Sequence, residues 1–148
     1  MSKENALAKV SLFANLEPKY IKGIAQICTE RTFNRGDVLM RQGDDGIGLY
    51  IILSGKVKVE KADQTGKQVE LASNGPGDIM GEFSVLDGAK RTATVTATES
   101  TNCLVLASWE FNSFMKAHPE VALDILPIIL KRFRETNNAL IGITSSSS

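Results

Sequence analysis

Residues 77–93 carry residue types suited to holding an anion. Gly81 lets a ligand approach the backbone closely, and the amides at the start of a short helical turn over 82–86 would point outward without partners. Arg91 follows where a returning strand could aim its guanidinium at the same point. This segment therefore predicts a site for a phosphate-like group.

Glu82 is the one residue of this segment that needs a separate explanation, because a carboxylate repels phosphate. It precedes Arg91 in the spacing Gly-Glu-x8-Arg. The carboxylate is explained if it accepts a hydrogen bond from a sugar hydroxyl next to the phosphate, so the two residues together indicate a phosphate joined to a ribose. The alternatives are a solvated carboxylate favoured by a helix dipole, and an arginine that is merely exposed on a strand.

Short alternating runs separated by turn residues surround this segment over residues 31–107. Such a pattern is typical of antiparallel strands in a sandwich or barrel. We expect a mainly β fold, an eight-stranded antiparallel β-roll of the jelly-roll kind. The strands that can be delimited are 31–33, 38–42, 49–53, 56–61, 68–72, 92–98 and 102–106.

Helices are expected on both sides of the roll, within a single domain over 1–148. Residues 1–30 show helical spacing, with a second helix starting at Pro18. Residues 108–143 predict two helices, the first with Ser108 as its N-cap and the second starting at His118-Pro119-Glu120. Trp109, Phe111 and Phe114 are expected in the core, and residues 144–148 as a disordered tail.

The last helix carries an apolar seam with alternating spacings of four and three. This is a heptad pattern with one polar position, and it predicts a homodimer through the helix. The alternative is a helix packed on its own domain, for which Ile125 and Ile128 supply a second face. Pro127 should kink the helix. The seam residues are Ala122, Leu126, Ile129, Phe133, Thr136, Leu140 and Ile143.

The balance of charged residues gives no support for binding to nucleic acid or to a membrane surface. Lys plus Arg and Asp plus Glu number 17 each, so no basic excess favours nucleic acid or a membrane surface. No signal peptide or spanning segment is visible, and we expect a cytoplasmic protein. Cys28 and Cys103 sit among apolar neighbours and are expected as buried thiols.

The segment over 77–93 resembles the phosphate-binding cassette of cyclic nucleotide-binding domains. The similarity lies in Gly81-Glu82-Phe83-Ser84-Val85-Leu86 followed by Arg91-Thr92-Ala93. It extends to two Gly-Asp turns, Gly43-Asp44 and Gly77-Asp78, and to the hairpin sequence Tyr-Ile-Ile-Leu-Ser-Gly-Lys-Val-Lys-Val over 50–59. The resemblance covers nearly the whole chain.

The resemblance implies roles for individual residues, with cAMP or cGMP as ligand. Arg91 would pair with the cyclic phosphate, and Glu82 would accept the ribose 2′-hydroxyl. Gly81, Phe83 and Ser84 would offer backbone amides or a hydroxyl. Thr92 occupies a position associated with guanine contact in the family, so cGMP stays an alternative ligand to cAMP. Lys90 stands where family members often have proline.

The last helix resembles that of the catabolite activator group, in which a polar pair touches adenine across the dimer. Thr136 and Asn137 stand at the matching places. Those regulators continue into a helix-turn-helix domain, whereas this chain stops at Ser148. We therefore expect a stand-alone sensor that signals through its C-terminal helix to an unidentified effector protein in trans, without contact to nucleic acid or membrane.

Three other functions are alternatives to this one. An enzyme with a metal site on the roll would need several converging ligands, and the sole histidine is His118 beside Pro119, so neither a metal nor catalysis is expected. A degenerate roll could serve as a ligand-free interaction module. The chain could also be the regulatory fragment of a larger transcription factor, channel or kinase.

Overall fold

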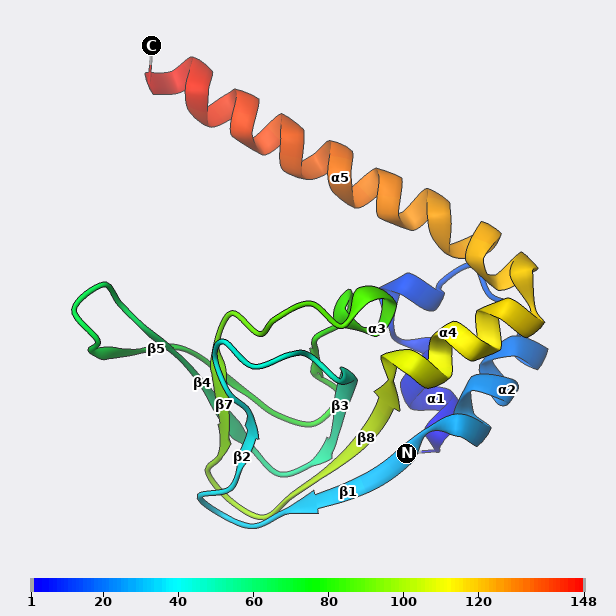
Figure 1. Ribbon diagram of the computed structural model, residues 1–148, viewed down its shortest axis with the longest axis horizontal. Coiled ribbons are helices and arrows are strands. Elements are labelled where there is room, and N and C mark those ends of the chain that lie inside the picture. The colour runs from blue at the N-terminus through cyan, green and yellow to red at the C-terminus, as the bar shows by residue number, and fades with distance from the viewer. Residues whose placement is uncertain (1, 148) are drawn as a thin grey trace.

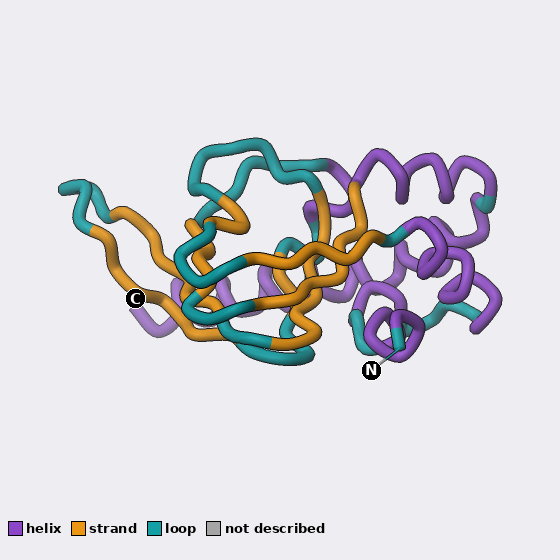
Figure 2. Tube along the Cα trace, turned by 90° about the horizontal axis from the view of Figure 1, so that it is seen from below, coloured by secondary structure: helices purple, strands orange, loops and turns teal. Residues whose placement is uncertain are grey.

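The computed structural model describes the backbone of residues 2–147 and the side chains of residues 2–138. Met1, Ser148 and the side chains of 139–147 lie outside this description. Helices gather at one end of the molecule and strands at the other, and the last helix, α5, extends from the helical end back over the side of the strands, rising away from them (Figure 1). The view from below shows the same division (Figure 2).

The strands form two four-stranded antiparallel sheets. One has the order β1-β8-β3-β6 and the other β2-β7-β4-β5. Strands distant in the sequence pair with each other, which gives a jelly-roll-like roll and confirms the predicted mainly β fold. The bounds are β1 Thr29–Phe33, β2 Val38–Met40, β3 Gly48–Ser54, β4 Val57–Ala62, β5 Gln68–Asn74, β6 Ile79–Met80, β7 Thr94–Ala97 and β8 Thr101–Ala107.

Strand β3 is buried on both faces and divides the apolar interior into two clusters. Successive side chains of a strand point to opposite sides. Leu49 and Ile51 pack among the helices, whereas Tyr50 and Ile52 pack inside the roll. The inner cluster contains Met80, directly before the 81–93 loop, so the loop starts from a packed wall.

The helices follow the predicted order. Pro18 opens α2 and Pro119 opens α5, where proline costs nothing because the first amides of a helix lack internal partners. Helix α3 packs against α4, and the 3₁₀ helix η1 packs against α5. The bounds are α1 Lys3–Ala8, η1 Ser11–Phe13, α2 Pro18–Ile27, α3 Ser84–Asp87, α4 Ser108–Ala117 and α5 Pro119–Ser147.

The start of α4 corrects two predictions. Ser108 is already helical, and the N-cap is Ala107, whose side chain makes no capping hydrogen bond. Trp109 is 69% exposed, while Phe111 is fully buried. Two residues span about 200° of a helix, so the core that takes Phe111 leaves Trp109 facing solvent.

Two further segments differ from expectation. Residues 79–80 form the short strand β6 beside β3, too short to show a period in the sequence. Helix α5 continues to Ser147, beyond residue 143 where a disordered tail was predicted. No proline follows residue 143, so the hydrogen-bond ladder can propagate. Pro127 lies inside the continuous helix.

Helix α5 has two apolar faces along its first half. Val121 and Ile125 are buried against the other helices, and Ile128 and Ile129 pack partly against the same cluster. The predicted alternative, in which the helix packs on its own domain, is therefore confirmed for this face. Ile129 is part of the same face. A second face remains exposed and consists of Leu123, Leu126, Leu130 and Phe133.

The exposed face overlaps with the predicted seam but is not identical to it. Leu126 and Phe133 belong to both, whereas Leu123 and Leu130 replace Ala122 and Ile129 as its large apolar members. The shift arises because Ile129 is drawn into the domain core. Leu140 and Ile143 of the predicted seam lie outside the described side chains.

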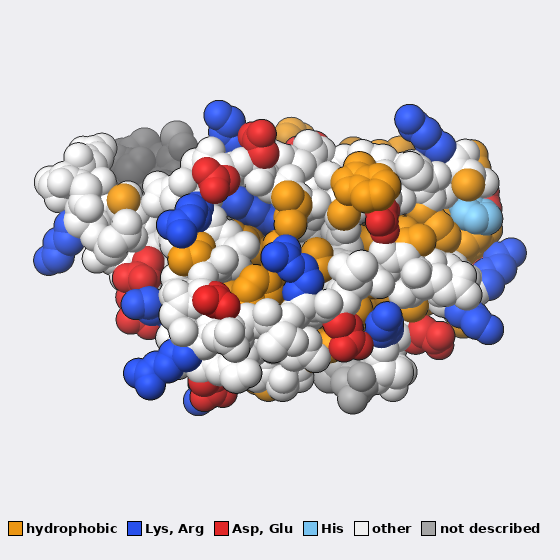
Figure 3. Space-filling model, turned by 60° about the horizontal axis from the view of Figure 1, so that its bottom comes forward, with side chains coloured by type: hydrophobic (Ala, Val, Ile, Leu, Met, Phe, Trp, Pro, Cys, Tyr) orange, Lys and Arg blue, Asp and Glu red, His pale blue; other side chains and the backbone are white. Residues whose placement is uncertain are grey.

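Both cysteines are free and buried, as predicted. Burial disfavours a thiolate, and it raises the pKa of Cys28 to about 12 and that of Cys103 to about 11. On the face drawn in Figure 3, Lys and Arg side chains alternate with Asp and Glu without a large patch of one sign. Within residues 2–147, none of the helices is long and apolar enough to cross a membrane.

Candidate functional site

Two glycines shape the loop that leads from β6 to Arg91. Gly81 has φ +72° and Gly88 has φ +64°, values that other residues rarely adopt. Gly81 turns the chain out of the sheet into α3, and Gly88 ends α3 in the left-handed conformation, its amide donating to the carbonyl of Ser84 at 2.8 Å. The predicted short helical turn is therefore present, over Ser84–Asp87 instead of 82–86, and it returns the chain to Arg91.

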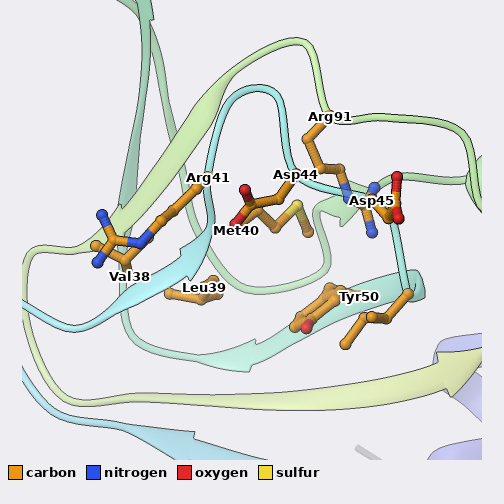
Figure 4. Close-up of a pocket in the computed structure, with 9 residues that line it drawn as sticks. Val38, Leu39, Met40, Arg41, Asp44, Asp45, Tyr50 and Arg91 are labelled. Carbon is orange, nitrogen blue, oxygen red and sulfur yellow. The ribbon is translucent and has the colours of Figure 1, made fainter.

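Arg91 is turned into the protein and is only 8% exposed. Its backbone is fixed by the turn over 43–44, since its amide donates to the Asp44 carbonyl at 2.8 Å and its carbonyl accepts from the Gly43 amide at 2.9 Å. Its Nη2 donates to the carbonyl of Gly48. Figure 4 shows the side chain reaching toward Tyr50, whose ring centroid lies 5.9 Å from the guanidinium carbon.

Among the side chains of residues 2–138, none offers a carboxylate within ion-pair distance of the Arg91 guanidinium. The ion pairs found among the described side chains involve other groups. Burial lowers the pKa of Arg91, because removal from water disfavours its charge, while Tyr50 acts in the opposite direction. A buried cation without a counter-ion is costly, so this position is prepared for an anion.

A cavity of about 570 Å³ opens beside Arg91. Glu82 and Thr92 also line it, and ligand pockets of small molecules commonly have this size. A smaller cavity of about 220 Å³ is lined by Arg91, Asp44, Asp45 and Tyr50, which are drawn in Figure 4. Arg91 therefore lines both cavities, and the predicted loop forms part of the wall of the larger one.

The wall of the larger cavity includes residues that sequence reasoning did not select. Its apolar side consists of Met40, Val59, Met80 and Val95, which belong to four different strands, and Asn74 adds an amide. Met40, Val59 and Val95 lie within predicted strands, whereas Met80 belongs to β6, which the sequence pattern did not predict. Only the pairing of the strands shows that they meet.

Glu82 lines the cavity, but its carboxylate is held from the N-terminal side. Oε1 accepts a hydrogen bond from the Ser11 hydroxyl at 2.6 Å and another from the Leu12 amide at 2.7 Å. These donors lie about 70 positions earlier in the chain. Sequence reasoning did not connect Glu82 with η1.

The family model described as the cyclic nucleotide-binding domain matches residues 30–118, from β1 to the end of α4. The chain belongs to the cyclic nucleotide-binding domain family. The match spans the roll and the loop with Arg91, so the predicted resemblance is confirmed.

Three known proteins are similar to this cyclic nucleotide-binding domain over most of its length. The CRP-like cAMP-activated global transcriptional regulator of Mycobacterium tuberculosis is 31% identical over 137 residues, which are 93% of this chain and 61% of the relative. The N-terminal domain of a transcriptional regulator from Streptomyces coelicolor is 34% identical, with a TM-score of 0.84 over 94% of this chain and 95% of that one. The regulatory domain of Toxoplasma gondii PKA with cAMP is 32% identical, with a TM-score of 0.70 over 76% and 43%.

The remaining residues expected to contact a nucleotide fall into two groups. Gly81, Phe83, Ser84 and Thr92 all line the larger cavity. The Ser84 amide donates to the Gly81 carbonyl at 3.0 Å, so the group that Ser84 has left to offer is its hydroxyl. Thr92 is exposed at the cavity rim.

Thr136 and Asn137 form the second group and lie on the exposed part of α5. Neither lines the cavity of this chain, and the Thr136 hydroxyl donates to the Arg132 carbonyl at 3.0 Å. A contact between α5 and the cassette does exist nearby, where the Arg132 guanidinium lies 5.1 Å from the centroid of Phe83. Among the described side chains there is no group of three or more potential metal ligands.

Replacing Gly81 with alanine should damage the site. A Cβ there would meet Nη1 of Arg91 and come within 2.7 Å of the Gly48 carbonyl, in a backbone conformation with φ +72°. We expect the free energy of unfolding to fall by about 1–3 kcal/mol, measured by urea denaturation, and nucleotide affinity to fall with it.

Gly66→Ala is the matched control for this substitution. Gly66 has φ +86°, but nothing lies within 4 Å of its added Cβ, and it lines neither cavity beside Arg91. It therefore carries a similar backbone strain without any contact to Arg91. Equal losses of nucleotide affinity in both variants would show that the contact between Gly81 and Arg91 is unimportant.

Proposed function

We propose that this chain is a regulatory domain whose ligand is cAMP, with the cyclic phosphate bound by Arg91. The observation that supports this most strongly is a buried guanidinium that pairs with none of the described carboxylates, at the edge of a cavity of about 570 Å³. A phosphodiester anion would supply the missing charge, and a planar guanidinium can donate two parallel hydrogen bonds to it. Binding would thus relieve an electrostatic cost already present in the free protein.

The rest of the cavity suits the other parts of a nucleoside cyclic phosphate. Glu82 offers a carboxylate to the ribose 2′-hydroxyl, and the apolar side with Met40 and Val59 offers a surface for the base. Phe83 and Ser84 contribute at the phosphate side. The M. tuberculosis relative is named cAMP-activated, and the T. gondii structure contains cAMP, which favours cAMP over cGMP as the proposed ligand.

Thermal unfolding in the presence of nucleotides tests the proposal. A ligand at 100 times its Kd stabilises the protein by about 2.7 kcal/mol, which raises Tm by roughly 5–10 °C in a domain of this size. We expect this rise with cAMP and a smaller one with cGMP at equal concentration. Calorimetric titration without heat from either nucleotide at millimolar concentration would favour a ligand-free interaction module.

Thr92 is proposed to influence which base is accepted. It lies at the rim of the cavity, and the family resemblance associates this position with guanine. Thr92→Ala should weaken cGMP binding by roughly fivefold, the size of one hydrogen bond, and leave cAMP binding nearly unchanged in calorimetric titration. An equal loss for both nucleotides would place Thr92 at the phosphate instead of the base.

We infer that the exposed face of α5 binds α5 of a second copy. Leu123, Leu126, Leu130 and Phe133 follow one another at spacings of three and four, and they are 68%, 50%, 44% and 61% exposed. Such a stripe matches the seam of a two-stranded coiled coil. Asn137 continues this stripe and Thr136 lies beside it, so in the proposed dimer both would approach the partner.

Signalling is proposed to pass through α5. The Arg132 contact with Phe83 joins this helix to the cassette, so a nucleotide that moves the cassette would alter how the helix packs. The chain spans about three fifths of the length of the M. tuberculosis relative. The expectations of an effector acting in trans and of no contact with nucleic acid stay predictions.

A further inference from the structure

The side chain of Glu82 is anchored before any ligand arrives. Its Oε1 accepts from the Ser11 hydroxyl at 2.6 Å and from the Leu12 amide at 2.7 Å. Within the part of the chain whose side chains are described, Oε2 takes part in no hydrogen bond. One oxygen is therefore occupied by two donors, while the other remains available at a residue that lines the cavity.

The two donors belong to a segment that is anchored in the helical core. They open η1, whose Leu12 and Phe13 side chains are 0% and 2% exposed in the helical core. The first amides of a helix have no partner inside it, and a buried amide needs one. The Glu82 carboxylate supplies that partner to Leu12, so its position is fixed by packed apolar residues.

We propose that Ser11 and the Leu12 amide are positioning groups for Glu82, and that they hold its carboxylate so that Oε2 can accept the ribose 2′-hydroxyl. This rests on the proposed binding of a cyclic nucleotide. A carboxylate has about four acceptor sites on its two oxygens, so the sugar and η1 do not compete. A glutamate fixed in advance also loses less side-chain freedom when the ligand binds.

The affinities of Ser11→Ala for cAMP and for 2′-deoxy-cAMP test this inference. Loss of one hydrogen bond that orients Glu82 should weaken cAMP binding by roughly 3–10-fold in calorimetric titration. The 2′-deoxy nucleotide cannot donate to Glu82, so its affinity should change by less than about twofold. A purely structural effect of the substitution would weaken both ligands equally.

Two further variants sharpen the comparison. Ser11→Thr keeps the hydroxyl and should restore the preference for the 2′-hydroxyl. Ser113→Ala removes a different exposed serine, on α4, and should leave both affinities unchanged. Glu82→Gln should shift the amide proton resonance of Leu12 in the free protein, because the acceptor loses its charge.

The outcomes separate this inference from the proposed function. Tighter cAMP binding by Ser11→Ala would overturn the inference, because it would mean that η1 competes with the sugar. Equal losses for both nucleotides would overturn it as well. cAMP binding that depends on Arg91 but not on Ser11 would overturn this inference alone, whereas a wild-type chain that binds neither nucleotide would overturn the proposed function together with it.

Discussion

Arg91→Ala should weaken cAMP binding by at least about 30-fold, since removing one partner of a buried charge-assisted pair typically costs about 2–5 kcal/mol. Arg91→Lys should lose nearly as much affinity for cAMP. An ammonium cannot both donate to the Gly48 carbonyl and present a planar pair of donors to the phosphate, as the guanidinium does. Calorimetric titration measures both losses. The ligand-induced rise in Tm should disappear with them.

The free protein should respond differently to loss of the same side chain. Burial lowers the pKa of Arg91, so the unliganded fold holds this charge at a cost. Replacing a buried charge with an apolar side chain of similar volume is often neutral or stabilising. Arg91→Met should therefore leave the free energy of unfolding unchanged, or raise it by roughly 1 kcal/mol, while nucleotide binding is lost.

Arg35→Ala is the control for the Arg91 variants. Arg35 is exposed in the turn between β1 and β2 and does not line either cavity beside Arg91. Its loss should change neither affinity nor stability. If Arg91→Ala bound cAMP as tightly as Arg35→Ala does, the assignment of the phosphate site would be wrong.

Phe133→Glu should convert the proposed dimer into a monomer. Phe133 is 61% exposed in the single chain, and burying a side chain of this size contributes about 1.5–3 kcal/mol at each of the two symmetric positions. The substitution removes that burial and brings two carboxylates together, so the dimer dissociation constant should rise by at least about 100-fold. Sedimentation equilibrium should then give the chain mass of 16.0 kDa in place of twice that value.

Trp109→Glu is the matched control on another helix. Trp109 is 69% exposed on α4, away from the stripe on α5, so its loss should leave the dimer intact. A wild-type chain that sediments as a monomer would contradict the proposed role of α5. A Phe133→Glu variant that stays dimeric would place the interface on another surface.

The sequence determined the fold class and the chemistry of the loop. Alternating runs over 31–107 predicted the roll, and the Gly81-Glu82 and Arg91-Thr92 pairs predicted the ligand type. These features depend on local rules, namely the period of a strand, the conformations that glycine permits and the charge of an arginine. They could be recognised without knowing which strands pair.

The support of these residues depends on contacts between distant segments. The Ser11 and Leu12 bonds to Glu82 join residues about 70 positions apart, and no local pattern encodes such a pairing. Packing of the core also determines which face of α5 stays exposed, because Ile129 packs against the core and Leu130 does not. Apolar periodicity limits the faces a helix can bury, but the neighbours it packs against select one, and those neighbours come from distant parts of the chain.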